Sequence, residues 1–173
     1  CLVSHTLHSA KKHGVYVSPD VFRKVEAALA PLTSQTGRTG YTVMNGSPSQ
    51  PSRFSSTMLS HPSDKSESIT ALALLSHFEY CESLGLSKVT DYPLYLLMKQ
   101  QAGLLAAKKP SWDVEGGSID MYYWYYGTLA MKKWGGDLWD DWRNTVRREL
   151  MNNQRVDSAK DNPVENLKLV SVF

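Results

Sequence analysis

Hydrophobic residues recur at spacings of three and four along most of the chain, which is the pattern of amphipathic α-helices. The first such segment covers residues 2–12, and Gly14 follows it as a stop signal. Ser18 supplies an N-cap and Pro19 a first-turn proline for a second helix, whose apolar side continues to Leu32. The pattern therefore predicts a short helical hairpin at the start of the chain.

Two further helices are predicted in the middle of the chain. Asp64 and Glu67 are spaced as in a capping box, and the helix after them should end near residues 84–85. The next helix starts within residues 90–93, where proline is tolerated in the first turn, and closes before Pro110. The first of these helices carries one predicted apolar stripe: Ala71, Leu74, Leu75, Phe78 and Cys81.

The last two predicted helices lie on either side of Gly135 and Gly136. The first runs roughly from residue 119 to residue 134, and the two glycines stop it. Acidic residues favour the start of the second, and Arg147 and Arg148 favour its later turns, because these charges complement the helix dipole. Its predicted buried stripe comprises Trp139, Trp142, Val146 and Leu150. The whole pattern predicts an all-α fold of about three antiparallel helical hairpins.

Two segments fall outside this helical pattern. Residues 33–62 are rich in Ser, Thr, Gly and Pro, and they predict a long loop with a brief extended piece at residues 40–43. A loop of this length suggests an active-site cover, an insertion or a partly disordered segment. Residues 155–173 are polar until their last seven, which fit a short strand, a docked end or a loose end. We therefore divide the chain into a helical domain, residues 1–154, and a C-terminal tail.

Composition and charge exclude several classes of protein. Hydrophobic residues make up 42% of the 173 residues, which is enough for a real core. The net charge is +2 with both signs mixed along the chain, so we expect no nucleic-acid partner and no polybasic membrane surface. No segment approaches the ~18 apolar residues of a transmembrane helix. Hydrolase, kinase and dehydrogenase motifs are likewise missing from the sequence.

The two cysteines, Cys1 and Cys81, leave the cellular compartment open. They could pair, but one bridge in a chain with this much core is not a disulfide scaffold. The chain starts at Cys1 without an initiator Met, so we expect it to be part of a longer protein or a processed form. A lipidated N-terminus at Cys1 is an alternative. The localisation therefore stays unassigned.

Two sets of side chains have the spacing of soft-metal ligands on a helix. Cys1, His5 and His8 fall on one helical face, but no fourth ligand accompanies them. His77 and Cys81 are four residues apart, and Phe78 beside them favours a packed helix face. We therefore predict no metal site and no cofactor.

The densest run of aromatic residues lies in the helix predicted for residues 119–134. Tyr122 to Tyr126 are consecutive aromatics, so in a helix they point in every direction around the axis, which predicts a helix enclosed by others. Asp120 precedes them and is the candidate catalytic acid. The candidate ligand-binding residues, whose aromatic faces could stabilise a cation, are Tyr122, Tyr123, Trp124, Tyr126 and Trp134. The alternative is that Asp120 caps the helix and the aromatics pack between helices.

Several motifs give the chain a likeness to a known family. They are the run from Asp120 to Thr128, Trp134-Gly135-Gly136 with Trp139 and Trp142, Gly40-Tyr41-Thr42, Thr70-Ala71 with Leu74-Leu75, and Gln154. On these residues the chain resembles bacterial proteins similar to squalene-hopene cyclases, in the terpenoid cyclase and protein prenyltransferase superfamily. The resemblance covers roughly residues 1–154. It implies an α/α toroid whose inner helices line an apolar cavity, of which three hairpins would make about half.

The same resemblance sets an expectation for catalysis. Class II cyclases of this kind protonate an alkene with an Asp-x-Asp-Asp motif, which this sequence lacks, since Asp137, Asp140 and Asp141 have a different spacing. Gln154 is also not followed by the Gly-x-Trp that is usual in the family. We therefore expect a segment without independent catalytic power, which binds an apolar, isoprenoid-like ligand or a protein partner through its aromatic helix.

Two alternatives remain open. The chain could be part of an active terpenoid cyclase, an isomerase, whose acid motif lies in another segment or in a second chain. It could instead be a structural domain whose aromatics fill the core, and which forms a homo-oligomer through an exposed hairpin edge. An Asp-x-Asp-Asp motif in the flanking coding sequence would favour the first alternative, whereas a strict monomer in solution would oppose the second.

Overall fold

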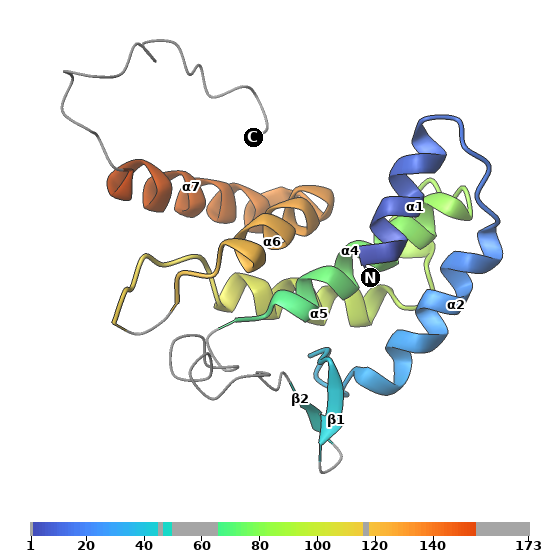
Figure 1. Ribbon diagram of the computed structural model, residues 1–173, viewed down its shortest axis with the longest axis horizontal. Coiled ribbons are helices and arrows are strands. Elements are labelled where there is room, and N and C mark those ends of the chain that lie inside the picture. Colours follow the sequence, from blue (N-terminus) through green and yellow to red (C-terminus); the bar gives the residue numbers. More distant parts are fainter. Residues whose placement is uncertain (1, 45–46, 50–65, 116–117, 155–173) are drawn as a thin grey trace.

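A computed structural model describes residues 2–44, 47–49, 66–115 and 118–154, which form an all-α fold with one small β-ribbon (Figure 1). The α-helices in this part of the chain are α1 (Leu2–Lys12), α2 (Pro19–Leu29), α4 (Ser68–Ser83), α5 (Tyr95–Ala107), α6 (Met121–Trp134) and α7 (Gly136–Asn153). The 3₁₀ turns are η1 (Ala30–Leu32) and η2 (Val89–Asp91), and the antiparallel strands are β1 (Thr42–Met44) and β2 (Ser47–Ser49). The predicted all-α class is confirmed. None of the helices described is long and apolar enough to cross a membrane.

Local capping signals set the ends of several helices, as predicted. The Ser18 hydroxyl oxygen accepts a hydrogen bond from the Asp20 N–H at 3.3 Å at the start of α2. Gly85 (φ 71°) and Gly135 (φ 77°) have the left-handed backbone that glycine favours where α4 and α6 end. The predicted tail, residues 155–173, lies outside the described residues, as does much of the predicted loop.

The start of α4 differs from the prediction. The helix begins at Ser68, and Glu67 occupies the N-cap position without a capping hydrogen bond from its side chain. The Glu67 carboxylate instead accepts from Arg38 Nε at 2.8 Å and from the Thr70 hydroxyl at 2.8 Å. Asp64 lies outside the described residues. The predicted role of Glu67 in a capping box is therefore wrong, because an ion pair with a distant residue uses this side chain.

The helix that others enclose is α4 and not α6. The predicted apolar stripe of α4 is buried in the core, but burial extends beyond it, because every residue from 68 to 79 is buried and this part of the helix has no solvent-facing side. On α6, Tyr123 and Trp124 are 2% and 3% exposed, whereas Tyr122 and Tyr125 are 38% and 54% exposed. The prediction that α6 is enclosed is therefore wrong, because one of its sides faces solvent.

Contacts at both ends show that α6 runs parallel to α4. At the starts of the two helices, the Ser66 hydroxyl donates to Asp120 Oδ2 at 2.7 Å. At their ends, the Lys133 ammonium pairs with the Glu82 carboxylate. The two helices therefore lie side by side along most of their length, as Figure 1 shows.

α1 and α2 cover the other side of α4 and run in opposite directions. Near the end of α1, His8 Nε2 lies 2.9 Å from Glu82 Oε2 at the end of α4, so α1 is parallel to α4. In α2, Glu26 lies 2.7 Å from His77 Nδ1. The later residue Leu29 lines a cavity with Ile69, which is earlier in α4. α2 is therefore antiparallel to α4.

Trp142 joins α7 to α6 in the core. Its side chain is fully buried, and its ring packs edge-on against Tyr123 with 5.6 Å between centroids. Its Nε1–H donates to Thr128 Oγ1 at 3.0 Å. The ring lies against Gly127, where an added Cβ would come within 2.5 Å of it. Glycine is therefore required here by close packing of the two helices.

Candidate apolar ligand site

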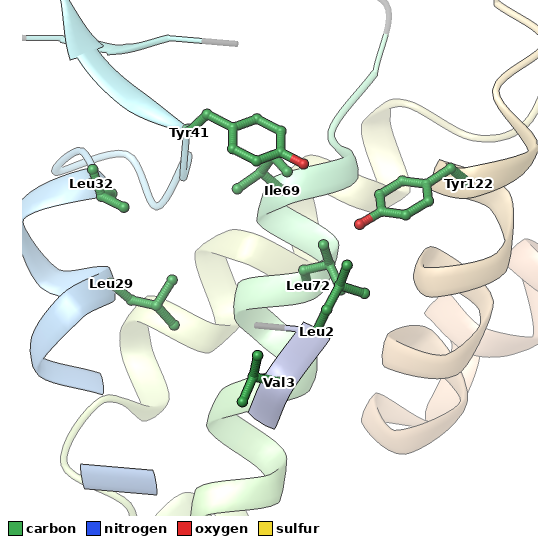
Figure 2. Close-up of a pocket in the computed structure, with 9 residues that line it drawn as sticks. Leu2, Val3, Leu29, Leu32, Tyr41, Ile69, Leu72 and Tyr122 are labelled. Carbon is green, nitrogen blue, oxygen red and sulfur yellow. The ribbon is translucent and has the colours of Figure 1, made fainter. Parts of the chain in front are cut away.

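An apolar cavity of about 330 Å³ lies where the first turns of α1, α4 and α6 meet the end of α2 (Figure 2). Its lining is Leu2, Val3, Leu29, Leu32, Gly40, Tyr41, Ile69, Leu72 and Tyr122. Apart from backbone atoms, the two tyrosine hydroxyls are the polar groups among these side chains. The cavity can therefore bury an apolar molecule while offering it hydrogen-bonding groups at one edge.

The helix directions explain why aliphatic side chains gather at this point. Because α1 is parallel to α4, Leu2 and Val3 in the first turn of α1 reach the start of α4, where Leu72 lies. Because α2 is antiparallel to α4, Leu29 in its last turn reaches the same level, and η1 adds Leu32. The cavity is thus a product of helix packing and not of one motif.

Tyr41 and Tyr122 approach each other from opposite sides of the cavity, with their hydroxyls turned inward (Figure 2). They come from segments 81 residues apart, the stretch before β1 and the first turn of α6. Burial, and then the neighbouring Tyr41 hydroxyl, raise the pKa of Tyr122 to about 12. Tyr122 is therefore a neutral phenol at physiological pH, able to donate or accept a hydrogen bond at the edge of the cavity.

The predicted ligand-binding aromatics do not form one site. Tyr122 lines the cavity, whereas Tyr123 and Trp124 are buried in the core between helices. Tyr126 is partly buried and stacks edge-on against Tyr122 at 4.7 Å between centroids. Trp134 lies at the other end of α6 and stacks on Tyr95 of α5 at 6.0 Å. The structure therefore brings only Tyr122 to the cavity, with Tyr126 behind it.

Asp120, the predicted acid, caps α6. Its Oδ1 accepts from the Tyr123 N–H at 2.9 Å, and its Oδ2 accepts from the Ser66 hydroxyl at 2.7 Å. Both oxygens are thus acceptors, which is the arrangement of a capping carboxylate and not of a proton donor. The capping role that the sequence left as an alternative is observed, and the catalytic role stays a prediction.

The cavity residues that the sequence did not single out are mostly aliphatic side chains at helix ends. The local pattern of Leu2, Leu32 and Ile69 is that of helical apolar positions, and such a pattern does not distinguish a core contact from a cavity wall. Leu2 and Val3 are 47% and 68% exposed. Tyr41 belongs to one of the motifs on which the family resemblance depends. It is also an aromatic residue in a polar segment, which is the signal that could have indicated a role in binding.

The histidines that have metal-ligand spacing in the sequence contact carboxylates. Within the residues described, no group of three or more His, Cys, Asp or Glu side chains could hold a metal ion. His5 Nδ1 lies 2.6 Å from Glu79, and His77 pairs with Glu26. Cys81 is a buried free thiol, and burial raises its pKa to about 11. Cys1 lies outside the described residues.

Comparisons of the chain with protein-family models, with curated proteins and with solved structures return no match.

Proposed function

We propose that the chain is a squalene cyclase-like α/α-hairpin array that binds an apolar, isoprenoid-like chain between α1, α2, α4 and α6, without protonating it. The observation that carries this proposal is the cavity of about 330 Å³, whose walls are aliphatic except for two tyrosines. One of these, Tyr122, belongs to the aromatic run on which the family resemblance chiefly depends.

The directions of the helices support the hairpin array. α1, α4 and α6 are parallel neighbours, and each is followed in the chain by a helix that packs against it, namely α2, α5 and α7. In an array of antiparallel hairpins, the first helices of successive hairpins lie in one layer and the second helices in another. The packing of α4 against α1 and α6, and of α5 against α7, is compatible with such an array, and α2 packs on α4 as well.

The size and chemistry of the cavity indicate the length of ligand. Small-molecule sites usually measure about 300–1,000 Å³, so this cavity lies at the lower end of that range. It suits a short isoprenoid, or one end of a longer chain whose remainder lies over the exposed Val3 side chain. Burying each methylene contributes about 0.8 kcal/mol, so a few isoprene carbons suffice for measurable affinity.

Two features support binding without protonation. Protonating an alkene requires an unusually strong acid held in an apolar pocket, and the sequence lacks the Asp-x-Asp-Asp motif that supplies it in the family. Asp120, the nearest candidate, has both carboxylate oxygens occupied by hydrogen-bond donors. Its carboxylate is thus used for capping α6.

Equilibrium dialysis with tritiated farnesol tests this proposal. Val3 lines the cavity and is 68% exposed, so Val3→Trp can place an indole over the cavity without disturbing the core. Leu96 on α5 is 72% exposed and away from the cavity, so Leu96→Trp is the matched control. We expect saturable binding that Val3→Trp weakens about tenfold, equivalent to about 1.4 kcal/mol, and that Leu96→Trp leaves unchanged. Absence of saturable binding, or equal loss in both variants, would contradict the proposal.

Product analysis of the same incubations, repeated with squalene, addresses catalysis. We expect both compounds to be recovered unchanged. A cyclised product that disappears in Asp120→Asn would instead favour the active-cyclase alternative, with Asp120 as the acid.

A further inference from the structure

Two tyrosines form the polar edge of the cavity that α1, α2, α4 and α6 enclose. Tyr41 and Tyr122 face each other across it with their hydroxyls turned inward (Figure 2). The two side chains share a hydrogen bond. The other lining residues contribute aliphatic side chains or, at Gly40, backbone alone. Among the side chains of the cavity, these two hydroxyls are therefore the groups that a polar part of a ligand can bind.

The hydrogen-bonding capacity of this pair indicates which head group it fits. Each neutral phenol has one O–H donor and two acceptor lone pairs. The hydrogen bond between Tyr41 and Tyr122 uses only one of the two donors, so the second donor and lone pairs on both oxygens can serve a ligand. A ligand hydroxyl can accept from one phenol and donate to the other, which closes a small cooperative ring. A hydrocarbon uses neither group.

The charges near the tyrosine pair disfavour an anionic head group. In the part of the chain that the structure describes, no Lys, Arg or His side chain lines the cavity. Arg38, three residues before Tyr41, pairs with the buried Glu67 carboxylate. Burial is the main cause of the raised pKa of Tyr122, and the Asp120 carboxylate adds to it, so its negative charge acts at this phenol. A diphosphate would therefore lose hydration without gaining a cation, and Asp120 would repel it.

We propose that Tyr41 and Tyr122 recognise the neutral hydroxyl of an apolar alcohol, so that the preferred ligand is a prenyl alcohol and not its diphosphate. This inference rests on the function proposed above, because it assigns the head group of the ligand in the same cavity. The hydroxyl lies between the two phenols, and the hydrocarbon chain lies against the aliphatic walls.

Competition against tritiated farnesol in equilibrium dialysis tests this preference. The competitors are unlabelled farnesol, farnesyl diphosphate and β-farnesene, which share a carbon skeleton and differ at its end. We expect farnesyl diphosphate to compete at least tenfold more weakly than farnesol, because no cation receives its charge. Farnesene is more hydrophobic than farnesol, so its affinity is compared between variants and not with that of farnesol.

Two conservative variants locate the head group. Tyr122→Phe and Tyr41→Phe each remove one hydroxyl and keep the ring. We expect each to weaken farnesol binding about three- to tenfold, as for loss of one hydrogen bond, and to leave farnesene binding unchanged. Tyr125→Phe is the matched control, because Tyr125 also lies on α6 and is 54% exposed but does not line the cavity. This variant should change neither affinity.

The outcomes separate this inference from the proposed function. Suppose that farnesol binds saturably and that Val3→Trp weakens it, but that both Phe variants leave farnesol unchanged or weaken farnesene equally. The cavity site then stands, and the head-group assignment is overturned. Competition by farnesyl diphosphate as strong as that by farnesol overturns it too. If neither farnesol nor farnesene binds, the cavity site itself fails, and the head-group assignment fails with it.

Discussion

Asp120 joins the start of α6 to the start of α4 through its two oxygens, which bind the Tyr123 N–H and the Ser66 hydroxyl. Replacing it with alanine removes both contacts, and loss of a helix cap typically costs about 0.5–2 kcal/mol. Asparagine keeps the capping oxygen, and its amide can donate to the hydroxyl of Ser66. We therefore expect Asp120→Ala to lower the free energy of unfolding in urea by about 1 kcal/mol and Asp120→Asn to lower it by less. Equal losses in the two variants would contradict the capping role.

His8 makes the stability depend on pH. Burial lowers its pKa below the ordinary value of 6.5, against the opposing effects of Glu82 and Glu79, and Lys12 and Lys133 lower it further. The unfolded chain therefore binds this proton more readily than the folded chain. The stabilising contribution is complete above pH 6.5 and is lost as the pH falls through the lower folded value.

His8→Gln tests this dependence through the free energy of unfolding between pH 7 and pH 5. We expect a smaller loss of stability over this range in the variant than in the parent chain. Glu82, whose pKa is lowered from 4.5 because Lys133, His8 and Lys12 outweigh the effect of burial, titrates below this window. His13 is exposed, so His13→Gln is the control for loss of an imidazole. An unchanged pH dependence in His8→Gln would contradict the assignment.

At the scale of the helices, local signals in the sequence predicted where each helix ends better than they predicted which of its sides are buried and which distant residues it contacts. Ser18-Pro19, Gly85 and Gly135 act through the backbone of their own helix, so a sequence suffices to interpret them. Glu67 has the residue type of a cap but pairs with Arg38, which is 29 residues away. No local pattern contains that partner.

The predicted burial of α4 and α6 differs more from the structure than the predicted helix ends do. Consecutive aromatics in α6 predicted an enclosed helix, yet an aromatic ring can be half exposed when only its edge packs, as at Tyr122 and Tyr125. The enclosed helix, α4, carries no charged residue from 68 to 78. A run of this length without Asp, Glu, Lys or Arg leaves no polar side for solvent, which is the pattern of a helix buried all round.

Gly127 and Gly103 provide a matched test of helix packing. Both lie inside helices, where alanine gains about 0.5–1 kcal/mol over glycine. A Cβ at Gly127 would lie 2.5 Å from the buried Trp142 ring, and overpacking of this kind costs about 1–3 kcal/mol. A Cβ at Gly103 meets no atom within 4 Å.

We therefore expect Gly127→Ala to lower the free energy of unfolding by about 1–2 kcal/mol and Gly103→Ala to raise it by about 0.5–1 kcal/mol. Urea titration followed by circular dichroism measures both changes. A stabilising Gly127→Ala would mean that α6 and α7 are further apart than the structure places them.

At the scale of the whole molecule, buried carboxylates connect distant segments to α4. Glu79 on α4 binds Ser4 and His5 of α1, and Glu26 of α2 binds His77 of α4 and the hydroxyl of Tyr92. These pairs join residues 51 to 75 positions apart. Removing one partner of such a pair leaves a buried polar group unsatisfied, so the helices around α4 should separate together and not one at a time.

Long separations along the sequence also explain how much of the candidate sites could be predicted. Tyr122 stood out as part of an aromatic run, but Leu2, Leu29 and Tyr41 become its neighbours only when α1 and α2 pack on α4. At a second cavity, His8 and Lys132 likewise meet although 124 residues separate them. The sequence therefore indicated which kinds of side chain are present, but not which distant side chains the fold brings to one cavity.

A helix covered on every side should exchange its amide hydrogens only when the whole molecule unfolds. We therefore expect the amides of α4 to exchange with deuterium more slowly than those of the other described helices. Their free energy of exchange should equal the free energy of global unfolding. Gly103→Ala supplies the control, because it changes α5 and touches no atom of α4. If α4 opens only globally, this variant should raise the exchange free energy of α4 by the same increment that urea unfolding reports. If the α4 amides instead exchange at unchanged rates in this variant, α4 opens locally, and the surrounding helices do not form a single cooperative unit around it.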